Sequence, residues 1–469
     1  MVAIDPVVTT HTSVFGCSTW SSRLEAMFVH HLNLVDWRCY ATADVELGPG
    51  VTIFVGQNGQ GKTNLVEAVE YLSSMSSHRV SSEAPLVKAG TPQAIVRGRV
   101  QAASDDPRQL LLEIEVNPGK ANRARINRNA LTRAREICGV LRTVVFSPED
   151  LAIVKGDPSD RRRFLDQIVI TRWPRMAGVK ADYEKALKQR NTLLKSLARP
   201  GGRPDEYALA TLDVWDAQLA RIGSELLHAR LDTITDLMPH VHEAYESIAP
   251  TNNIARAEYK TSLDITPGVA EESGRVFLEG RLRDAMLERR REELARGVSL
   301  VGPHRDDLTL YIGELPAKGY ASHGECWSLA LALRLGSFQL LRADGIEPVL
   351  VLDDVFAELD STRRLRLAEH VRDAEQVLVT AAVATDVPEL LILDDQGRPT
   401  GRRYRVRSGT VVLAGVDGEP LDALVDDAPG PADPQPGQGE GPVNQLTPQP
   451  VDKSVDEAVD DATASGEDG

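Results

Sequence analysis

The sequence predicts an α/β protein that combines a phosphate-binding sheet, an antiparallel β meander and a helical insertion. Three observations lead to this fold class. An apolar, β-branched run at 51–55 enters a glycine loop at 56–63, and helical periodicity follows the loop. Residues 84–146 alternate apolar and polar side chains, as half-buried strands do. Apolar side chains then recur at helical spacing through most of residues 151–299.

Length and composition limit the class of protein. A chain of 469 residues can bury a large core and should form two or more domains. No apolar run reaches transmembrane length, and the first residues lack the basic start and apolar middle of a signal peptide. The four cysteines are scattered without a C-x-x-C pair, which favours reduced thiols over a zinc site or disulfides. We therefore expect a cytoplasmic protein with no membrane partner.

The negative charge is concentrated near the end of the chain. The formal net charge is −16, but residues 417–469 contain 14 acidic residues and one lysine, so the rest of the chain carries only about −3. A nearly neutral body can still have basic faces. The segment 417–469 is also rich in Pro and Gly and poor in large apolar residues, so we expect it to be disordered. Residues 1–22 lack clear periodicity and are expected to form a disordered extension.

The glycine loop has the chemistry of a nucleotide site. Its glycines let backbone N–H groups approach phosphate oxygens, and the following helix points its positive end at the same anion. Lys62 would reach the β- and γ-phosphates, and the Thr63 hydroxyl would bind Mg²⁺. A glycine loop without a ligand is the alternative, which the complete motif between a strand and a helix disfavours. The predicted nucleotide-binding residues are Gly56, Gln57, Asn58, Gly59, Gln60, Gly61, Lys62 and Thr63. The elements expected around them are strands at 27–34, 43–47 and 51–55 and a helix from Thr63 to about Ser77.

The meander at 84–146 is basic. Between residues 120 and 142 there are seven Lys or Arg residues and one Glu. Two interpretations stay open, a solvated face or a strip that follows a phosphate backbone. No aromatic residue is interleaved, and residues 144–146 then look like another core strand.

Residues 147–299 are expected to form the helical insertion. Ser147 or Ser159 could cap its first helices. Apolar residues recur every three or four positions over 215–226 and 234–245, which predicts long, partly coiled-coil-like helices. Such stripes are core packing far more often than cofactor sites. The elements expected next are strands at 298–301 and 308–312 and a helix at 327–342.

A second apolar strand ends in two carboxylates. Residues 348–352 precede Asp353 and Asp354, and another buried strand is expected at 376–380. In a chain with a phosphate loop this is the Walker B pattern, in which Asp353 would hold Mg²⁺ and Asp354 could act as the general base. Adjacent acids after a strand are common by chance, but the four apolar residues before them and the phosphate loop favour the functional interpretation.

A Ser-x-Gly-Glu sequence at 322–325 stands at the head of the helix expected at 327–342. A helix N-terminus offers free N–H groups to an anion. Because the phosphate loop already supplies one set of phosphate ligands, a second anion site makes best sense across a dimer, where it would complete the partner's nucleotide site. Taken alone, the pattern is usually only a helix cap.

The order of these motifs resembles the SMC-like group of ABC-type ATPases of DNA maintenance, and within it the RecF family of bacterial recombination mediators. The shared order is GQNGQGKTN at 56–64, the helical insertion, SHGE at 322–325 and LDDVFAELD at 352–360. The resemblance covers about residues 24–416, and its further matches are at 64–68, 77–79, 146–151, 161–166 and 301–308. It implies an ATPase head with a first lobe at 23–146, a helical lid or arm at 147–299 and a second lobe at 300–416.

The resemblance also implies roles for individual residues. ATP and Mg²⁺ would bind at 56–63, and a signature segment of Ser322, Gly324 and Glu325 would contact the γ-phosphate of the opposite subunit. The other implied roles are lid coupling for Glu149, a dimer-crossing loop for Asp360 and a place near the lid base for His304 and Arg305.

Three residues depart from the family pattern. His323 and Cys326 stand where Gln or Arg is more common, and either could alter contacts with the partner's site. Asp354 stands where many ABC-type ATPases have Glu. Its carboxylate is one methylene closer to the backbone, which predicts slow hydrolysis.

The resemblance implies an ATP-driven switch that works on DNA. ATP would clamp two copies head to tail around duplex or gapped DNA, and hydrolysis would open the clamp. The implied task is recombinational repair, in which the protein helps to load the recombinase with RecR and RecO as partners. The implied DNA contacts are Lys120, Arg123, Arg125, Arg128, Arg161, Arg162 and Arg163.

Two other classes have less support. A transporter-type ABC subunit would not need an insertion of about 150 residues and would show its own family pattern. An ATPase-linked nuclease would need a further acidic metal cluster, which the irregular acidic tail does not supply. Dimerisation that depends on both ATP and DNA would separate the DNA-binding switch from the transporter-type subunit.

Overall fold

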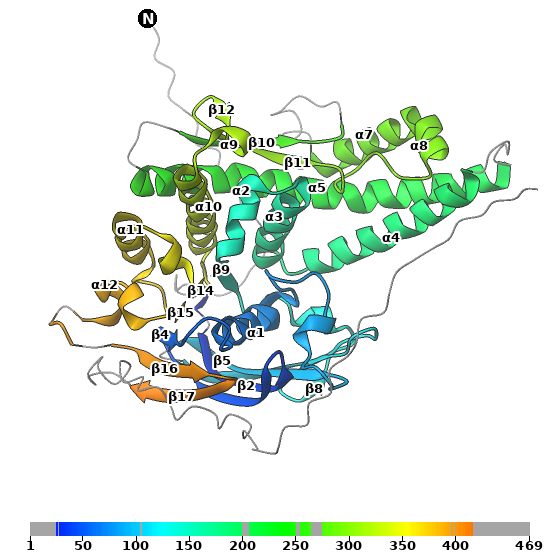
Figure 1. Cartoon of the computed structure of the whole chain (residues 1–469). Helices are drawn as coiled ribbons and strands as arrows, with labels where there is room; N and C mark the ends of the chain where they lie inside the picture. The colour runs from blue at the N-terminus through cyan, green and yellow to red at the C-terminus, as the bar shows by residue number, and fades with distance from the viewer. Residues whose placement is uncertain are drawn as a thin grey trace, which may run out of the picture. The chain divides into compact units, whose positions relative to one another are not determined.

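The computed structural model describes residues 25–26, 28–103, 106–198, 206–249, 254–263, 274–394, 396–398 and 400–415 (Figure 1). The two segments expected to be disordered, 1–22 and 417–469, lie outside the described residues. Within the described part of the chain, no helix is both long and apolar enough to span a membrane. The predicted α/β class, with its phosphate-binding sheet, meander and helical insertion, is confirmed.

A six-stranded sheet carries the phosphate loop. In spatial order its strands are β17 (Thr410–Gly415), β16 (Arg402–Arg407), β4 (Gly50–Val55), β15 (Gln376–Ala381), β14 (Val349–Asp353) and β9 (Thr143–Phe146). All neighbours are parallel except the edge pair β16–β17. Strands β14 and β15 are buried along their whole length, which explains the apolar runs Val349–Leu352 and Val377–Val379 within them. Because β4 and β14 flank β15, the phosphate loop and the acidic pair meet at one edge of the sheet.

A second, antiparallel sheet forms the predicted meander. Its strands, in spatial order, are β3 (Tyr40–Glu46), β2 (Phe28–Trp37), β5 (Ala94–Ala103), β6 (Asp106–Val116), β7 (Arg123–Ile126) and β8 (Asn129–Ala130). Helix α1 (Lys62–Ser74) shares one hydrophobic core with this sheet. The packing is close, since a Cβ at Gly98 of β5 would lie 2.7 Å from Leu72 Cδ1 of α1. The helix ends at Ser74 and not near Ser77, because Met75 adopts a left-handed conformation (φ 52°) and closes the last turn.

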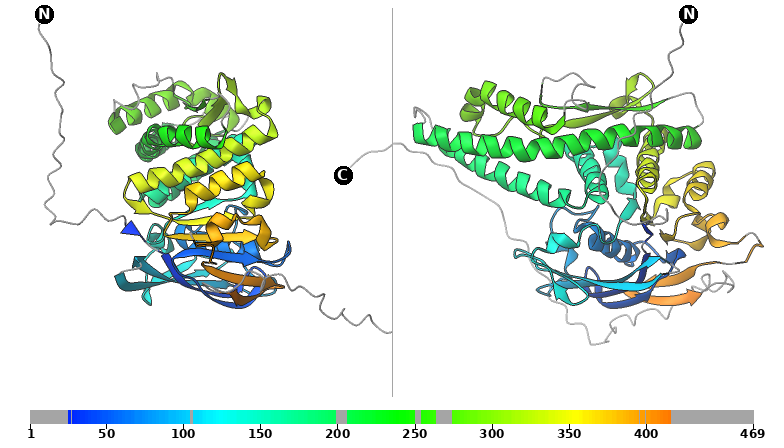
Figure 2. Two further views of the ribbon diagram at one scale, coloured as in Figure 1. Left: turned by 90° about the vertical axis from the view of Figure 1, so that its left-hand side faces the viewer. Right: turned by 180° about the vertical axis from the view of Figure 1, so that it is seen from behind.

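The helical insertion is built around one helix of 43 residues, α5 (Glu206–Ile248). Helices α4 (Met176–Leu197) and α7 (Gly274–Glu288) pack along α5, as Figure 2 shows, and share a core with it. Helix α3 (Pro158–Arg172) packs against α5 as well, and α8 (Arg290–Arg296) packs against α4. The apolar stripes of the sequence are therefore core packing, as predicted.

The border between the insertion and the second lobe differs from the prediction. Residues 298–301 form no strand, because their backbone N–H groups are bound by side chains: Ser299 N donates to Asn191 Oδ1 (2.8 Å) and Leu300 N to Glu293 Oε1 (2.6 Å). Strand β10 (Ala255–Lys260), inside the insertion, pairs with β11 (Asp307–Ile312), which then pairs with β12 (Leu315–Pro316). A small sheet thus crosses the predicted border at 299/300.

Helix α10 (His323–Ala343) starts at the signature segment and packs against both α5 and the phosphate-binding sheet through β9. The remaining elements are β1 (Glu25–Ala26), β13 (Ile346–Glu347), α2 (Leu151–Lys155), α9 (Ala317–Tyr320), α11 (Ser361–Val371), α12 (Glu389–Ile392), and the 3-10 turns η1 (Ala84–Leu86), η2 (Ala134–Ile137), η3 (Pro148–Asp150), η4 (Val355–Glu358) and η5 (Ala384–Asp386).

Candidate nucleotide-binding site

The phosphate loop joins the end of β4 to the start of α1, as predicted. Gly59 and Gly61 have φ angles of 81° and 112°, a region that favours glycine. At Gly56 a side chain is excluded by a steric clash, because a Cβ there would lie 2.2 Å from the carbonyl oxygen of Val406. The glycines of the motif are therefore required by backbone conformation and by close packing against β16.

A strand and a turn of the surrounding fold brace the loop. The Tyr40 hydroxyl, at the start of β3, donates to the Gly61 carbonyl oxygen (3.0 Å). The Ser408 N–H, in the turn between β16 and β17, donates to Gln60 Oε1 (2.6 Å), and Gly409 N donates to the Gln60 carbonyl oxygen (3.2 Å). The loop is held in shape by the surrounding fold, so its N–H groups are arranged before any ligand arrives.

Lys62 lies over the loop with its side chain only 3% exposed. Its Nζ is 3.3 Å from Asn58 Oδ1, 3.4 Å from the Gln57 carbonyl oxygen and 3.7 Å from Asp354 Oδ2. A buried ammonium that is held mainly by neutral oxygens is a strong binder for phosphate oxygens.

Thr63 and the acidic pair meet although 290 positions separate them. The Thr63 hydroxyl donates to Asp353 Oδ1 (2.9 Å), and the Thr380 hydroxyl at the end of β15 donates to the same oxygen (2.7 Å). A hydroxyl and a carboxylate are hard oxygen ligands, and Mg²⁺ typically takes one or two protein oxygens together with substrate phosphates. The residues present fit Mg²⁺. Among the described residues, no group of three or more His, Cys, Asp or Glu side chains forms a separate metal site.

Asp354 begins the turn after β14 in a left-handed conformation (φ 49°). Its N–H donates to Thr380 Oγ1 (2.9 Å), and within the described residues its Oδ1 is buried without a hydrogen-bond partner. Burial raises the pKa of the Asp354 carboxyl, and the charge of Lys62 opposes this. Lys62 Nζ lies 3.7 Å from the other oxygen, Oδ2, so the unpartnered Oδ1 can accept a hydrogen bond from a water molecule.

His78 and Glu70 are site residues that sequence reasoning missed. His78 Nδ1 lies 2.6 Å from Glu70 Oε2, and its Nε2 lies 3.6 Å from Asp353 Oδ2. Burial alone would lower the pKa of His78, but the carboxylates of Glu70 and Asp353 outweigh it and raise the pKa to about 10. In the sequence, the Ser-His-Arg match at 77–79 includes His78 but gives it no role. No pattern in the sequence marks Thr380 as a site residue.

The signature segment forms the N-terminus of α10. Ser322 and Glu325 make a capping box, in which Glu325 N donates to Ser322 Oγ (3.3 Å) and Ser322 N donates to Glu325 Oε2 (2.8 Å). These hydrogen bonds lower the pKa of Glu325. Within the described part of the chain, no hydrogen bond or ion pair joins residues 322–325 to the phosphate loop, and Figure 1 shows α9, which leads into α10, away from α1.

The two departures at the signature segment have different surroundings. His323 is exposed, and its Nδ1 lies 3.1 Å from Lys155 Nζ at the end of α2. Cys326 is buried and its thiol faces the carbonyl oxygen of Ala321 (3.7 Å). His323 can therefore face a partner, whereas Cys326 acts on the site only through the packing of α10.

The structure also places Asp360, predicted for a dimer-crossing loop, and Glu149, predicted for lid coupling. Asp360 caps α11, since Arg363 N donates to its Oδ1 (3.0 Å). The Arg363 guanidinium in turn donates to Ser328 Oγ of α10 (2.9 Å). Glu149 is exposed, and the neighbouring Asp150 makes the buried contact between the lid junction and α10: Arg334 Nε and Nη2 donate to its Oδ1 (3.0 and 2.6 Å).

The predicted DNA contacts are not equally available. Lys120, Arg123 and Arg128 are exposed, and Lys120 and Arg123 line a hollow of ≈ 640 Å³ beside β7. Arg125 is half-buried and paired with Glu113. The prediction for Arg161 needs correction, because this side chain is buried and its Nε and Nη2 donate to Asp307 Oδ1 and Oδ2 (2.7 and 2.9 Å). Of its neighbours, Arg162 donates to the Asp306 carbonyl oxygen (2.7 Å), and Arg163 remains exposed beside Asp160.

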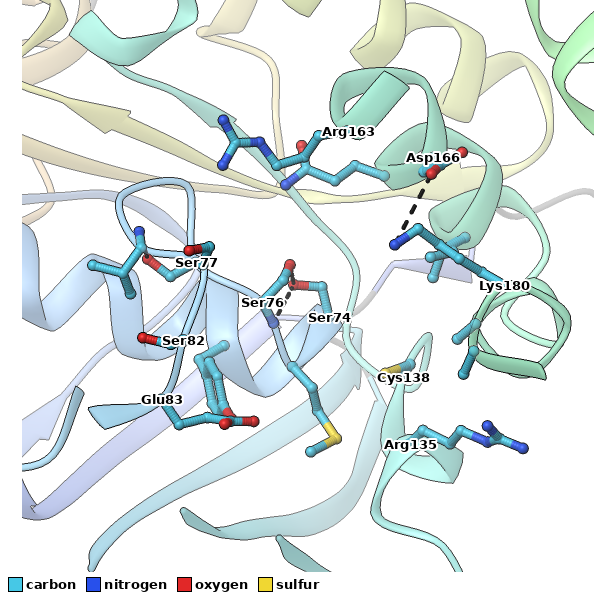
Figure 3. Close-up of a pocket in the computed structure, with 18 of the residues that line it drawn as sticks. Ser74, Ser76, Ser77, Ser82, Glu83, Arg135, Cys138, Arg163, Asp166 and Lys180 are labelled. Atoms are coloured by element: carbon cyan, nitrogen blue, oxygen red, sulfur yellow. Dashed lines mark hydrogen bonds and ion pairs between the residues drawn. The ribbon is translucent and has the colours of Figure 1, made fainter. Parts of the chain in front are cut away.

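Another cavity, of ≈ 410 Å³, lies between the segment after α1 and helices α3 and α4. Figure 3 shows serine side chains, among them Ser76 and Ser82, on one side and Arg163 and Lys180 on the other. No residue of the phosphate loop lines it, so it is not the nucleotide site. It separates the first lobe from the lid helices.

His304 and Arg305 tie the base of the lid together. The Tyr183 hydroxyl lies 2.7 Å from His304 Nδ1, and His304 Nε2 lies 3.3 Å from the Ser299 carbonyl oxygen, to which Arg305 also donates (2.7 Å). Burial chiefly lowers the pKa of His304 to about 4, with help from the charges of Arg305, Arg162 and Arg190. The ring is therefore neutral at pH 7 and receives one hydrogen bond while it donates the other.

This burial predicts acid sensitivity. An unfolded histidine has a pKa of about 6.5. Between pH 6.5 and 4 the unfolded chain therefore binds a proton that the folded ring excludes, so the free energy of unfolding decreases as the pH is lowered, by about 3 kcal/mol in total. His304→Gln, which keeps an acceptor and a donor, should flatten the dependence of the unfolding free energy on pH in this range, measured by urea unfolding at pH 7 and 5. His242→Gln on the surface of α5 should leave the slope unchanged. Equal slopes for His304→Gln and wild type would contradict the prediction.

Comparison with known proteins identifies the family of this chain. Residues 28–389 match the family described as the RecF/RecN/SMC N terminal domain. The DNA replication and repair protein RecF of Cutibacterium acnes is 62% identical over 394 residues, with 82% of this chain and 98% of that protein covered, and RecF of Streptomyces avermitilis is 58% identical over 388 residues, with 82% and 99% covered. A solved structure of the recombination mediator protein RecF with ATP, in the RecFOR pathway, has a TM-score of 0.73 and 27% identity, with 84% of this chain and 99% of that chain covered. This chain therefore belongs to the RecF family of DNA replication and repair proteins.

Proposed function

We propose that this protein is an ATP-dependent, DNA-binding recombination mediator of DNA repair and replication. The observation that supports it most directly is the Thr63–Asp353 hydrogen bond beside Lys62, which brings together the phosphate and Mg²⁺ ligands that one copy offers to a nucleoside triphosphate. The relatives add the task, since they are named as DNA replication and repair proteins. A transporter-type subunit has no comparable support.

ATP acts as the link between two copies in this proposal. The phosphate loop binds one face of the triphosphate, and the capped N-terminus of α10 from the second copy binds the other through free N–H groups and Ser322. Neither copy completes the site alone. The γ-phosphate is then the group that distinguishes the closed from the open state.

Hydrolysis is proposed to be slow, so ATP times the clamp more than it drives chemistry. Asp354 accepts a hydrogen bond from the attacking water, and its short side chain and its proximity to Lys62 limit how well it orients that water. Bound Mg²⁺ would supply charge neutralisation at the phosphates. The Arg334–Asp150 contact joins the lid junction to α10, and the cavity between the lid and the first lobe leaves room for movement.

DNA, RecR and RecO are the proposed partners. The matched solved structure is described as a mediator of the RecFOR pathway, which supports RecR and RecO. The proposed site of action is the cytoplasm. Duplex and gapped DNA would lie along the exposed basic residues near β7. Arg161 is left out of this surface because Asp307 holds it.

Charge reversal tests the DNA surface. The triple variant Lys120→Glu, Arg123→Glu, Arg128→Glu should weaken binding to gapped DNA by about tenfold or more at about 0.1 M salt, and should reduce the slope of log affinity against log salt by about 2 to 3, because each phosphate contact contributes about 0.9. Nucleotide binding should be unchanged, as the phosphate loop is not touched. Fluorescence anisotropy across a salt series measures both quantities.

A matched control has the same charge change on exposed residues of the lid, with Lys185→Glu, Arg289→Glu and Arg296→Glu. The control should retain most of the DNA affinity and the salt slope. Equal losses for the two triple variants would mean that net charge, and not the surface near β7, governs binding.

A further inference from the structure

His78 occupies a fixed position behind the acidic pair. It lies in the segment that follows α1, and its ring is buried. Glu70 of α1 holds it twice, since both His78 Nδ1 (2.6 Å) and the His78 backbone N–H (3.1 Å) contact Glu70 Oε2. Glu70 is itself buried, so the imidazole cannot turn without breaking both contacts.

The other ring nitrogen faces Asp353. Nε2 lies 3.6 Å from Asp353 Oδ2, too far for a hydrogen bond but close enough for an ion pair, and it has no hydrogen-bond partner among the described residues. Asp353 Oδ1 is used differently, because it accepts from both Thr63 and Thr380. The two oxygens of the carboxylate therefore have separate neighbours, hydroxyl groups on one side and His78 on the other.

We propose that His78 is a positioning residue of the nucleotide site: anchored by Glu70, it fixes Oδ2 of Asp353 and so sets the direction in which this carboxylate presents an oxygen to Mg²⁺. The inference rests on the proposed function. Without the ring, the hydroxyl groups of Thr63 and Thr380 still hold Oδ1, but none of the described residues fixes Oδ2 of Asp353, so the carboxylate can turn about Oδ1. Partners that orient a metal-binding carboxylate typically contribute 10- to 100-fold to metal affinity.

The test measures Mg²⁺ dependence separately from nucleotide binding. A fluorescent ATP analogue is titrated into the full-length protein with Mg²⁺ chelated, and Mg²⁺ is then added to obtain the midpoint of the Mg²⁺-dependent increase in affinity. His78→Phe fills the space without a donor and should raise this midpoint by about 10- to 100-fold, while affinity for the analogue without Mg²⁺ changes by less than about twofold. His78→Gln places an amide donor at a similar reach and should recover most of the loss. His242→Phe, a surface histidine of α5, should match wild type.

The outcomes separate the alternatives. An unchanged Mg²⁺ midpoint in His78→Phe would overturn the proposal, as would an equal loss of Mg²⁺-free binding in both His78→Phe and His78→Gln, which shows a merely structural role. If His78→Phe does not fold, Glu70→Gln provides the test, because it keeps an acceptor for the ring but removes the charge that anchors it, and the midpoint should rise by a smaller factor. Wild-type protein that bound no analogue under any condition would overturn the proposed function and not the role of His78.

Discussion

Lys62→Ala is expected to abolish ATP-driven dimerisation. The ammonium is buried in the loop, and its Nζ lies within 3.7 Å of Asn58 Oδ1, the Gln57 carbonyl oxygen and Asp354 Oδ2, where it can contact the phosphates. Hydrogen bonds to charged groups contribute about 1.5–3 kcal/mol each, and each 1.4 kcal/mol is tenfold, so the loss of two contacts weakens ATP binding by about 100-fold or more. Size measurement by light scattering with ATP, ADP and no nucleotide checks this result, with and without gapped DNA.

Lys88→Ala is the matched control. This lysine is near the same site but donates to the Cys39 carbonyl oxygen (2.9 Å) and not into the loop. Its removal should leave dimerisation with ATP intact. If both lysine variants lost dimerisation equally, the effect would be a general change of charge.

A mixing experiment tests whether the site is shared between copies. Ser322→Arg should also prevent dimerisation, because the larger side chain occupies the N-terminus of α10 where the partner's γ-phosphate is proposed to bind. A mixture of Lys62→Ala and Ser322→Arg chains contains pairs with one complete site, formed by the intact loop of one chain and the intact signature segment of the other. Partial recovery of dimers in the mixture alone is expected. A Ser322→Arg chain that dimerised and hydrolysed ATP like wild type would contradict the shared site.

The central part of the site could be predicted from sequence because its parts are local motifs. The loop at 56–63 and the acidic pair each lie at the end of an apolar strand, and parallel strands bring such ends to one edge. His78 could not be predicted in the same way. Its contact with Asp353 joins residues 275 positions apart, and no local pattern marks a histidine whose two nitrogens both face carboxylates.

The errors have physical causes as well. The apolar sequence at 298–301 has the composition of a strand, but Asn191 and Glu293 bind its N–H groups before any neighbouring strand can. The charge of the run Arg161–Arg163 suggests that all three side chains face DNA. Arg161, however, lies three and four positions before Phe164 and Leu165, which are buried on the same face of α3. When helical spacing is applied to the charged residues as well as to the apolar ones, it predicts that the Arg161 side chain is buried.

The largest expected effect on stability comes from a substitution of Arg190, which lies in the centre of the lid base. Its side chain is 0% exposed, and its guanidinium donates to Asp216 (2.6 Å), Glu293 (2.6 Å) and Ser299 (2.7 Å). These contacts join α4, α5 and α8. Removing one member of a buried ion pair leaves a charge without compensation, which costs about 3–5 kcal/mol. Arg190→Met should lower the free energy of unfolding, measured with urea, by about this amount. Arg296→Ala is the control, because the Arg296 side chain is 62% exposed in its ion pair with Glu292, and it should change the free energy by less than about 0.5 kcal/mol.

A second substitution identifies which carboxylate is responsible. Asp216 keeps an ion pair with Arg290 (2.7 Å) when Arg190 is lost, so the uncompensated charge belongs to Glu293, which is fully buried. Glu293→Gln removes that charge while its amide oxygen can still accept from Leu300 N. The double variant Arg190→Met, Glu293→Gln should therefore be more stable than Arg190→Met alone, although it has lost one more native group. If the double variant were less stable, the cost at Arg190 would come from lost packing, and the ion network would not be what holds the lid base together.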